Sequence, residues 1–308
     1  MSTNQTGGSN TACGYEALEL NTGDGNSAFG NDALRSNSSG EKNTALGNEA
    51  LENNTTANHS TAVGHHALTT NTTGTQNVAV GSECLQDCST GSNNTAVGTY
   101  TMRSLTTGSH NCALGLQALY GLSTGVDNVA MGKQAGQDIT TGDNNICFGL
   151  DAGRAGSPGG AITTGDNNII LGNNSHSYLA ARISLSVTSD KRDKTDIKDF
   201  THGLSWIKKL RPVTYHWDQR SAYSDDLSVA PDGTHKESKL NIGLIAQEEL
   251  EVEKEHGYGN DKDSMLITDL SEDGNHFSMK YERLVPILIN AVKELSAEVE
   301  QLKSQLNN

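Results

Sequence analysis

A repeat of 17 residues constrains the fold of this chain more than any other feature of its sequence. Glycine recurs at intervals of 17 residues, apart from a first interval of 16 and a last of 23. Self-similarity at a fixed period is typical of solenoids, in which each unit packs only on its neighbours. The ten repeat glycines are Gly14, Gly30, Gly47, Gly64, Gly81, Gly98, Gly115, Gly132, Gly149 and Gly172.

Each repeat carries four apolar positions. The residue before the glycine is always apolar, and the one before that is Ala except for Cys147 and Ile170. Three and four residues after the glycine stands a second pair, usually Ala-Leu, which decays to Ala135-Gly136 and Ala152-Gly153. Because glycine permits positive φ and asparagine tolerates it, we predict two very short strands per repeat, separated by turns.

Asparagine occupies the position four residues before the glycine in nine copies, with Ser60 in the other. Stacked amides can bond along a ladder, and rungs about 4.8 Å apart would give a solenoid about 45 Å long. Since two of the four apolar positions are mostly alanine, we expect neighbouring chains to complete the core as a trimer; a monomeric β-solenoid is the alternative. Loss of leucine at Gly136 and Gly153, with the insertion around Ser157–Gly160, suggests that the coil loosens or changes cross-section.

The repeat shows no constellation of catalytic residues. Two residues after the glycine the side chain varies from Glu16 to His66 and Tyr100, and varied side chains on a rigid scaffold suit a recognition surface. A metal at His59, His65 and His66 is not expected, because adjacent residues of a short strand face opposite ways. We predict no metal, no cofactor and no glycanase activity.

The five cysteines show no zinc-site spacing. Cys13, Cys84 and Cys147 stand where other copies have small apolar residues, so we expect them to be buried. A bond between Cys84 and Cys88 is left open.

The net charge of −15 argues against nucleic acid and anionic membrane surfaces as partners. Residues 1–174 hold 5 Lys and Arg against 14 Asp and Glu, and the remainder 17 against 23. No apolar run is close to the length of a membrane span, which is about 20 residues. Met1–Asn10 does not have the pattern of an export signal. We expect a soluble protein without membrane insertion.

The string Asn94-Thr95-Ala96-Val97-Gly98 and its equivalents resemble the head repeats of trimeric autotransporter adhesins. That resemblance implies a trimeric β-roll.

The junction after the repeat carries a candidate catalytic pair. Residues 181–187 alternate as a strand would, and Ser189 then precedes Lys194 by five residues. Ser-Lys is a known combination of nucleophile and base, provided that burial keeps the amine neutral. The alternative is a solvated charged turn.

Three further motifs follow in the C-terminal part. Gly203–Trp217 predicts a short helix ended by a proline and continued by a strand, and Asn241–Leu250 predicts a strand running into a helix. Tyr281–Pro286 opens a terminal helix. Trp206, Tyr215 and Trp217 are expected in the core.

These motifs, with Ser189-Asp190 and Lys194 upstream, are similar to the C-terminal intramolecular chaperone of phage tail spikes and fibres, the endosialidase-type self-cleaving family. The resemblance covers about residues 186–308. It implies a domain that trimerises its β-structured passenger and then cuts itself off once, without turnover. Ser189 would be the nucleophile, Lys194 the general base and Ser189-Asp190 the cleaved bond.

The terminal helix carries a heptad seam in its own right. The residues at its a and d positions are alternately three and four residues apart. Valine occupies most a positions and leucine the d positions, and this composition by itself favours a dimer. We follow the resemblance, which implies a trimer. The seam is Val285, Leu288, Val292, Leu295, Val299, Leu302 and Leu306.

The sequence thus predicts a mainly β passenger at 1–174, a connector strand at 175–188, an α+β chaperone and self-protease at 189–280, and a coiled-coil trimerisation helix at 281–308. We expect the distal part of a tail fibre or spike, synthesised in the host cytoplasm and located in the virion tail. Its partners would be two further copies, other tail proteins and a host-surface receptor. The alternative is a bacterial trimeric surface adhesin with a non-cleaving trimerisation domain. The chain begins inside the repeat, as expected of a fragment or a short tip protein.

Overall fold

The computed structural model describes residues 7–176, 179–180, 182, 187–223, 228–272 and 274–307. The chain divides into two compact units, Met1–Ser177 and Tyr178–Asn308. The connector strand predicted at 181–187 lies largely outside the described residues.

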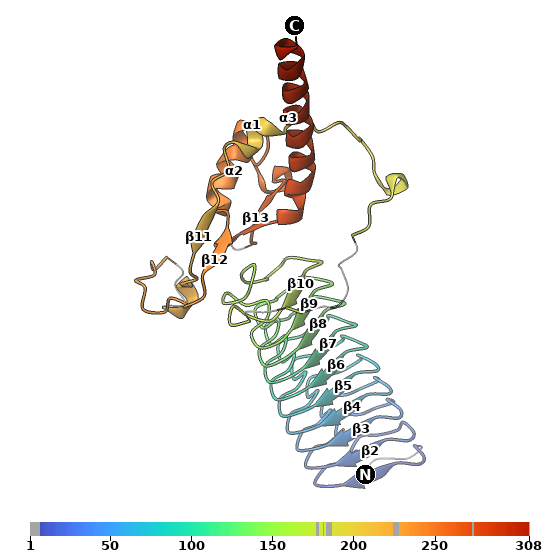
Figure 1. The fold of residues 1–308 in the computed structure, drawn as a ribbon. Helices are drawn as coiled ribbons and strands as arrows, with labels where there is room; N and C mark the ends of the chain where they lie inside the picture. Colours follow the sequence, from blue (N-terminus) through green and yellow to red (C-terminus); the bar gives the residue numbers. More distant parts are fainter. Residues whose placement is uncertain are drawn as a thin grey trace. The chain divides into compact units, whose positions relative to one another are not determined.

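The N-terminal unit is a parallel β-solenoid, as predicted (Figure 1). Each repeat contributes one strand of three residues, and the strands pair in chain order into one ten-stranded sheet. They are β1 (Thr11–Cys13), β2 (Ser27–Phe29), β3 (Thr44–Leu46), β4 (Thr61–Val63), β5 (Val78–Val80), β6 (Thr95–Val97), β7 (Cys112–Leu114), β8 (Val129–Met131), β9 (Ile146–Phe148) and β10 (Ile169–Leu171).

Equivalent residues of successive repeats lie opposite each other along this sheet. Ala45 pairs with Ala62 and Ala62 with Ala79, and the central strand residue points inward and is fully buried in β2 to β6. Because side chains alternate along a strand, the two flanking residues point outward. The register therefore follows directly from the repeat.

The second strand predicted in each repeat is absent from the described residues, because the Ala-Leu pair lies in a turn. Glu49 has φ 56° and Leu51 φ 52°, so the chain bends sharply at this corner. A left-handed conformation costs a non-glycine residue about 1–2 kcal/mol. Full burial of Leu51 offsets this cost, since a buried leucine contributes about 1.5–3 kcal/mol.

One chain fills the core of the solenoid by itself. The inward alanines and the turn leucines Leu18, Leu34, Leu68 and Leu85 are fully buried without a partner chain. At these positions, therefore, the core does not need side chains from a neighbouring chain, contrary to our expectation. Trimerisation of the passenger stays a prediction.

The coil does not loosen where the leucines are lost. At Gly136 an added Cβ would lie 2.7 Å from Leu119, so the space is already occupied. In the last rungs Ile139 and Ile162 are buried. They occupy the position at which the first rung has the buried residue Asn21. The strands β9 and β10 still pair in register.

The asparagine ladder is confirmed. Asn94 Nδ2 donates to the carbonyl of Gly108 at 3.0 Å, and its Oδ1 accepts from the backbone N–H of Asn111 at 3.0 Å. Asn111 repeats both bonds one rung further along. Each buried amide therefore satisfies backbone groups of the corner that would otherwise be orphaned.

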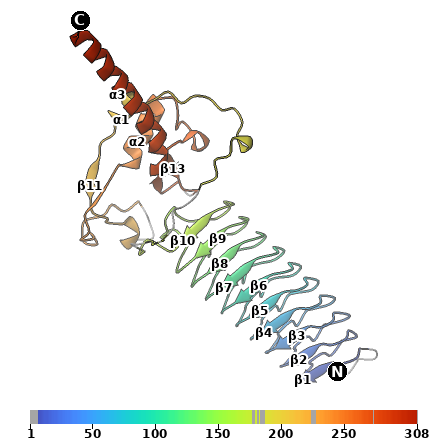
Figure 2. The same cartoon turned by 45° about the vertical axis from the view of Figure 1, so that its right-hand side comes forward.

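The C-terminal unit has the expected α+β composition (Figure 2). In its described residues, two antiparallel strand pairs, β11–β12 and β13–β14, accompany the helices α1, α2 and α3. The elements are η1 (Lys191–Asp193), α1 (Leu204–Ile207), β11 (Val213–Tyr215), η2 (Arg220–Ala222), β12 (Asn241–Gly243), α2 (Ala246–Glu255), η3 (Lys262–Ser264), β13 (Thr268–Leu270), β14 (Phe277–Met279), η4 (Tyr281–Arg283) and α3 (Leu284–Leu306).

The core of this unit forms around Trp206, which is fully buried as predicted. Val252 of α2, Ile267 and Ile287 of α3 pack in the same cluster. The prediction for Trp217 is wrong, because this side chain is 50% exposed. It lies beyond the end of β11 and rests edge-on against Tyr215, which is half-buried.

Candidate functional site around Ser189 and Lys194

A short 3-10 turn builds the geometry of the candidate dyad. Asp190 caps η1, and its carboxylate accepts from the backbone N–H of Arg192 at 2.9 Å. The guanidinium of Arg192 also donates to Asp190 Oδ2 at 2.6 Å. These bonds hold the pKa of Asp190 below its usual value. The capped turn folds the chain back so that residue 194 approaches residue 189.

The structure brings the two predicted catalytic residues together. Lys194 Nζ lies 2.6 Å from Ser189 Oγ, in hydrogen-bond contact. A nucleophile and its base must lie within about 2.6–3.2 Å of each other. The pair therefore has the distance that nucleophilic catalysis requires.

The surroundings of the pair are open to solvent. Ser189 and Lys194 are both exposed, and among residues 187–199 Asp190 alone is half-buried. Val187 is 74% exposed and Ile197 61%. A lysine acts as a base when it is neutral, and burial is the usual cause of neutrality. In the single chain the dyad is therefore assembled but uncovered.

The terminal helix presents two different faces. Ile287 and Ala291 are buried against the unit, Glu294 Oε2 accepts from the backbone N–H of Leu204 at 2.7 Å, and Asn290 donates to the carbonyl of Phe200 at 2.6 Å. The seven heptad positions are instead between 40% and 85% exposed. The seam therefore faces away from the unit that the helix belongs to.

Two buried glutamates of α2 were missed by sequence reasoning. Glu253 is fully buried and accepts from the backbone N–H groups of Leu266, Ile267 and Thr268 at 2.7–3.0 Å. Glu249 is 2% exposed, and its Oε1 accepts from Trp206 Nε1 at 2.8 Å. Burial raises the pKa of Glu249 to about 7. The available signal was their placement at four-residue spacing beside Leu250 and Val252, on the apolar side of α2.

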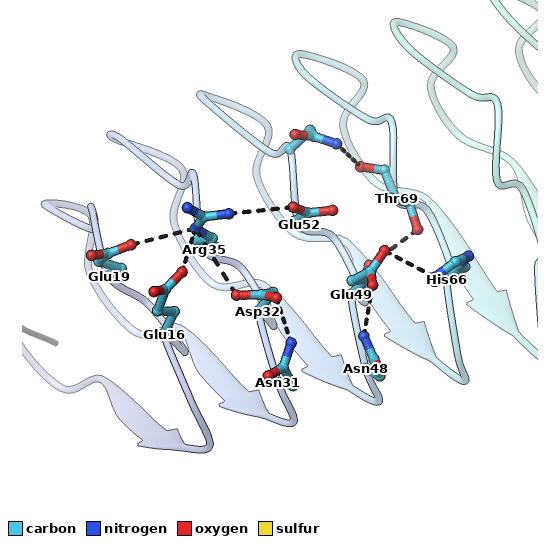
Figure 3. Close-up of polar contacts among 11 residues, drawn as sticks. Glu16, Glu19, Asn31, Asp32, Arg35, Asn48, Glu49, Glu52, His66 and Thr69 are labelled. Carbon is cyan, nitrogen blue, oxygen red and sulfur yellow. Dashed lines mark hydrogen bonds and ion pairs between the residues drawn. The ribbon is translucent and has the colours of Figure 1, made fainter.

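The first rungs of the solenoid carry an acidic cluster on the turns that follow the strands, at residues 15–20, 31–36 and 48–53 (Figure 3). We call this side of the solenoid the turn face. Arg35 Nε lies 2.9 Å from Glu16 and 3.4 Å from Glu19, and Arg35 Nη1 lies 3.8 Å from Glu52. Burial, with the neighbouring charge of Glu49, raises the pKa of Glu52. Glu16 stands at the variable position two residues after the repeat glycine, for which we expect a recognition role, whereas Glu19, Arg35 and Glu52 stand five residues after it.

The histidines and cysteines of the repeat depart from expectation in two places. His65 and His66 lie in a turn, and their rings stack 3.8 Å apart instead of pointing opposite ways. Cys13 is exposed, because the residue before the repeat glycine points outward. Cys84, Cys88 and Cys147 are buried and free. Within the described part of the chain no group of three His, Cys, Asp or Glu could hold a metal ion.

Comparison with known proteins gives one match. The family model described as chaperone of endosialidase matches residues 189–258, whereas neither curated proteins nor solved structures yielded a match. No helix in the described residues is long and apolar enough to cross a membrane. Members of the matched family are self-cleaving chaperones. The match begins at Ser189, the first residue of the candidate dyad, and this similarity over residues 189–258 supports a role as an intramolecular chaperone.

Proposed function

We propose that the chain is the distal part of a phage tail fibre or spike. Its C-terminal unit trimerises the solenoid, aligns the rungs and then removes itself by cutting between Ser189 and Asp190. The solenoid stays in the virion tail, contacts other tail proteins and binds a receptor on the host surface through its variable turn positions.

The contact between Ser189 Oγ and Lys194 Nζ carries this proposal. Ser and Lys five residues apart are common, but here they touch at the first residue of a segment similar to self-cleaving chaperones. The exposed apolar seam of α3 supports the trimer, because seven apolar side chains along one helix face stay in water until other helices cover them.

A repeated solenoid benefits from such a template. Ten rungs of nearly identical sequence offer many wrong registers of similar energy. Helices that associate first at one end fix the register there, and the rungs align from that end. Removal of the template afterwards leaves a product whose persistence depends on its slow unfolding rate.

The chemistry of the cut restricts where the nucleophile comes from. If Ser189 Oγ attacked the carbonyl carbon of its own residue, it would close a strained four-membered ring. In our proposal the Ser189–Lys194 pair of one chain therefore attacks the Ser189–Asp190 bond of a neighbouring chain. This arrangement also covers the exposed segment 187–199 and gives Lys194 the burial that a neutral amine needs.

Neutral Lys194 takes the hydroxyl proton of Ser189 while Oγ adds to the neighbour's carbonyl carbon. The C–N bond to Asp190 breaks, and the leaving amine receives that proton. Water then hydrolyses the ester with Lys194 as base. The products are a carboxylate at residue 189 and an amine at residue 190.

A denaturing gel of purified wild type beside Ser189→Ala and Lys194→Ala tests the dyad. Wild type should split, both variants should stay whole, and the matched control Lys191→Ala, an exposed lysine of the same turn, should split like wild type. The released fragment should begin at Asp190. If wild type stays whole while it sediments as a trimer, the protease proposal fails; if it sediments as a monomer, the trimer proposal fails.

Mixed trimers test attack between chains. Wild type is co-produced with a tagged Ser189→Ala chain, and trimers containing both are isolated through the tag. The tagged chain should be cut, since a neighbour supplies the serine. If the tagged chain stays whole while its wild-type neighbours split, attack occurs within one chain. A fragment beginning at Ser189 would show that the preceding bond is cut, through a five-membered ring.

A further inference from the structure

The outer face of the ten-stranded sheet is unlike the other faces of the solenoid. Two columns of side chains point outward from the strands, one on each side of the buried central residue. The first column is Thr11, Ser27, Thr44, Thr61, Val78, Thr95, Cys112, Val129, Ile146 and Ile169. The second is Cys13, Phe29, Leu46, Val63, Val80, Val97, Leu114, Met131, Phe148 and Leu171. We call these two columns the strand face.

The strand face excludes charge in every rung. None of its 20 positions is charged, although residues 1–174 hold 14 acidic and 5 basic side chains, a net charge of 5 − 14 = −9. The acidic cluster around Arg35 lies instead on the turn face. Two copies of so acidic a solenoid repel each other through most of their surfaces, whereas the strand face lets them meet without opposing like charges.

The second column of the strand face is apolar and partly exposed in the single chain, whereas the first column holds Thr or Ser in five rungs. Phe29 is 41% exposed, Leu46 49% and Leu114 48%. A continuous apolar strip of this kind marks an interaction surface. Single apolar side chains are common on protein surfaces. Ten apolar side chains in one column, by contrast, indicate a surface that another molecule covers.

The size of the strand face limits how strongly it can bind. Nine rung spacings of about 4.8 Å and three residues of about 3.3 Å give a footprint of about 43 by 10 Å, or about 430 Å². A stable interface buries about 800 Å² on each partner. The face is therefore too small to hold two free chains together, but large enough to associate once the chains are tethered and their effective concentration is high.

We propose that the strand face binds the strand face of further copies of this chain, rung against identical rung, and that the contact depends on the chains being tethered at their C-terminal helices. This inference rests on the proposed trimer. Side chains that point outward in one chain then form an inter-chain core, and the intra-chain core of alanine and leucine stays as it is.

Engineered cysteines test the proposal in the full chain. The background carries Ser189→Ala to keep the chain whole, with Cys13→Ser and Cys112→Ser to clear the strand face; the other cysteines are buried. Val80→Cys adds a probe in the centre of the face. Thr90→Cys, an exposed position in a turn outside the strands, is the matched control. After mild oxidation Val80→Cys should give mainly cross-linked dimers on a non-reducing gel, and Thr90→Cys at least about ten-fold fewer.

Sedimentation of the same samples separates the two proposals. A trimer in which Val80→Cys does not cross-link overturns the strand-face proposal and leaves the trimer standing. Equal cross-linking at both positions also overturns it, because it would report random collision. A monomer in sedimentation overturns the proposed trimer and the strand-face contact with it. Adding Val63→Lys and Val97→Lys on either side of the probe should abolish cross-linking by placing like charges in the interface.

Discussion

Replacing Glu249 with glutamine should make the stability of the C-terminal unit less dependent on pH. Glu249 is 2% exposed, Trp206 donates to Oε1, and Oε2 has no hydrogen-bond partner among the described residues. Burial raises its pKa from 4.5 to about 7, the Trp206 bond opposes the rise, and the charge of Glu253 adds to it. Glutamine keeps the acceptor for Trp206 and carries no charge.

Stability changes with pH because the folded and unfolded chains bind the Glu249 proton over different pH ranges. Below about pH 4.5 both bind the proton. Between about 4.5 and 7 the folded state binds more protons than the unfolded state, so its stability falls as the pH rises, and above 7 the loss is complete. A rise in the pKa of Glu249 from 4.5 to about 7 corresponds to a loss of folding free energy of about 3 kcal/mol.

The groups around Glu249 define what the assay must control. Lys209, Arg211 and Glu248 line the same small hollow as Glu249. Arg211 pairs with Glu248 and Lys209 with Glu255, and His256 stacks on Trp206. Since other ionisable groups lie beside Glu249, the informative quantity is the difference in unfolding free energy between variant and parent. Both should carry Ser189→Ala and be unfolded in urea at one protein concentration, with tryptophan fluorescence as the signal, since Trp206 and Trp217 both lie in the C-terminal unit.

At pH 8 the Glu249→Gln variant should exceed its parent by about 2–3 kcal/mol, and at pH 5 by less than about 1 kcal/mol. The control Glu248→Gln removes an exposed partner of Arg211 and should show no gain on raising the pH. An equal difference between Glu249→Gln and its parent at both pH values would refute the argument from burial.

Three further changes test the remaining features. Leu295→Lys puts charge into the exposed α3 seam and should turn the trimer into monomers in sedimentation, whereas Glu298→Lys, outside the seam, should not. Gly47→Ala places a Cβ 2.4 Å from the carbonyl oxygen of Gly64, at φ 144°, and should lower the urea midpoint of the solenoid by far more than Gly156→Ala, which lies in the same unit and has open space around it. Equal effects would contradict the close stacking. Asn94→Leu orphans two buried backbone groups and should destabilise the solenoid by about 2–4 kcal/mol in urea unfolding, so a neutral effect would show that the ladder is dispensable.

Local and periodic interactions account for what the sequence alone determined. Every rung repeats the same contacts with its neighbour, so the spacing of the glycines was enough to predict the solenoid, its strand order and the asparagine ladder. The contact between Ser189 and Lys194 is likewise local, because one capped turn of a few residues produces it. The heptad seam was readable because its pattern lies within a single helix.

The tertiary structure decided what depends on residues far apart in the chain. The corner that places Leu51 at positive φ follows from how a whole rung closes, and no property of the Ala-Leu pair announces it. Glu249 and Glu253 are buried because α2 packs against Trp206 and β13, 43 and 15 residues away. Trp217 is half exposed because no such partner covers it among the residues that the structure describes. A burial pattern that distant segments create together cannot be read from any one of them, and for this reason the core of the C-terminal unit became visible only in three dimensions.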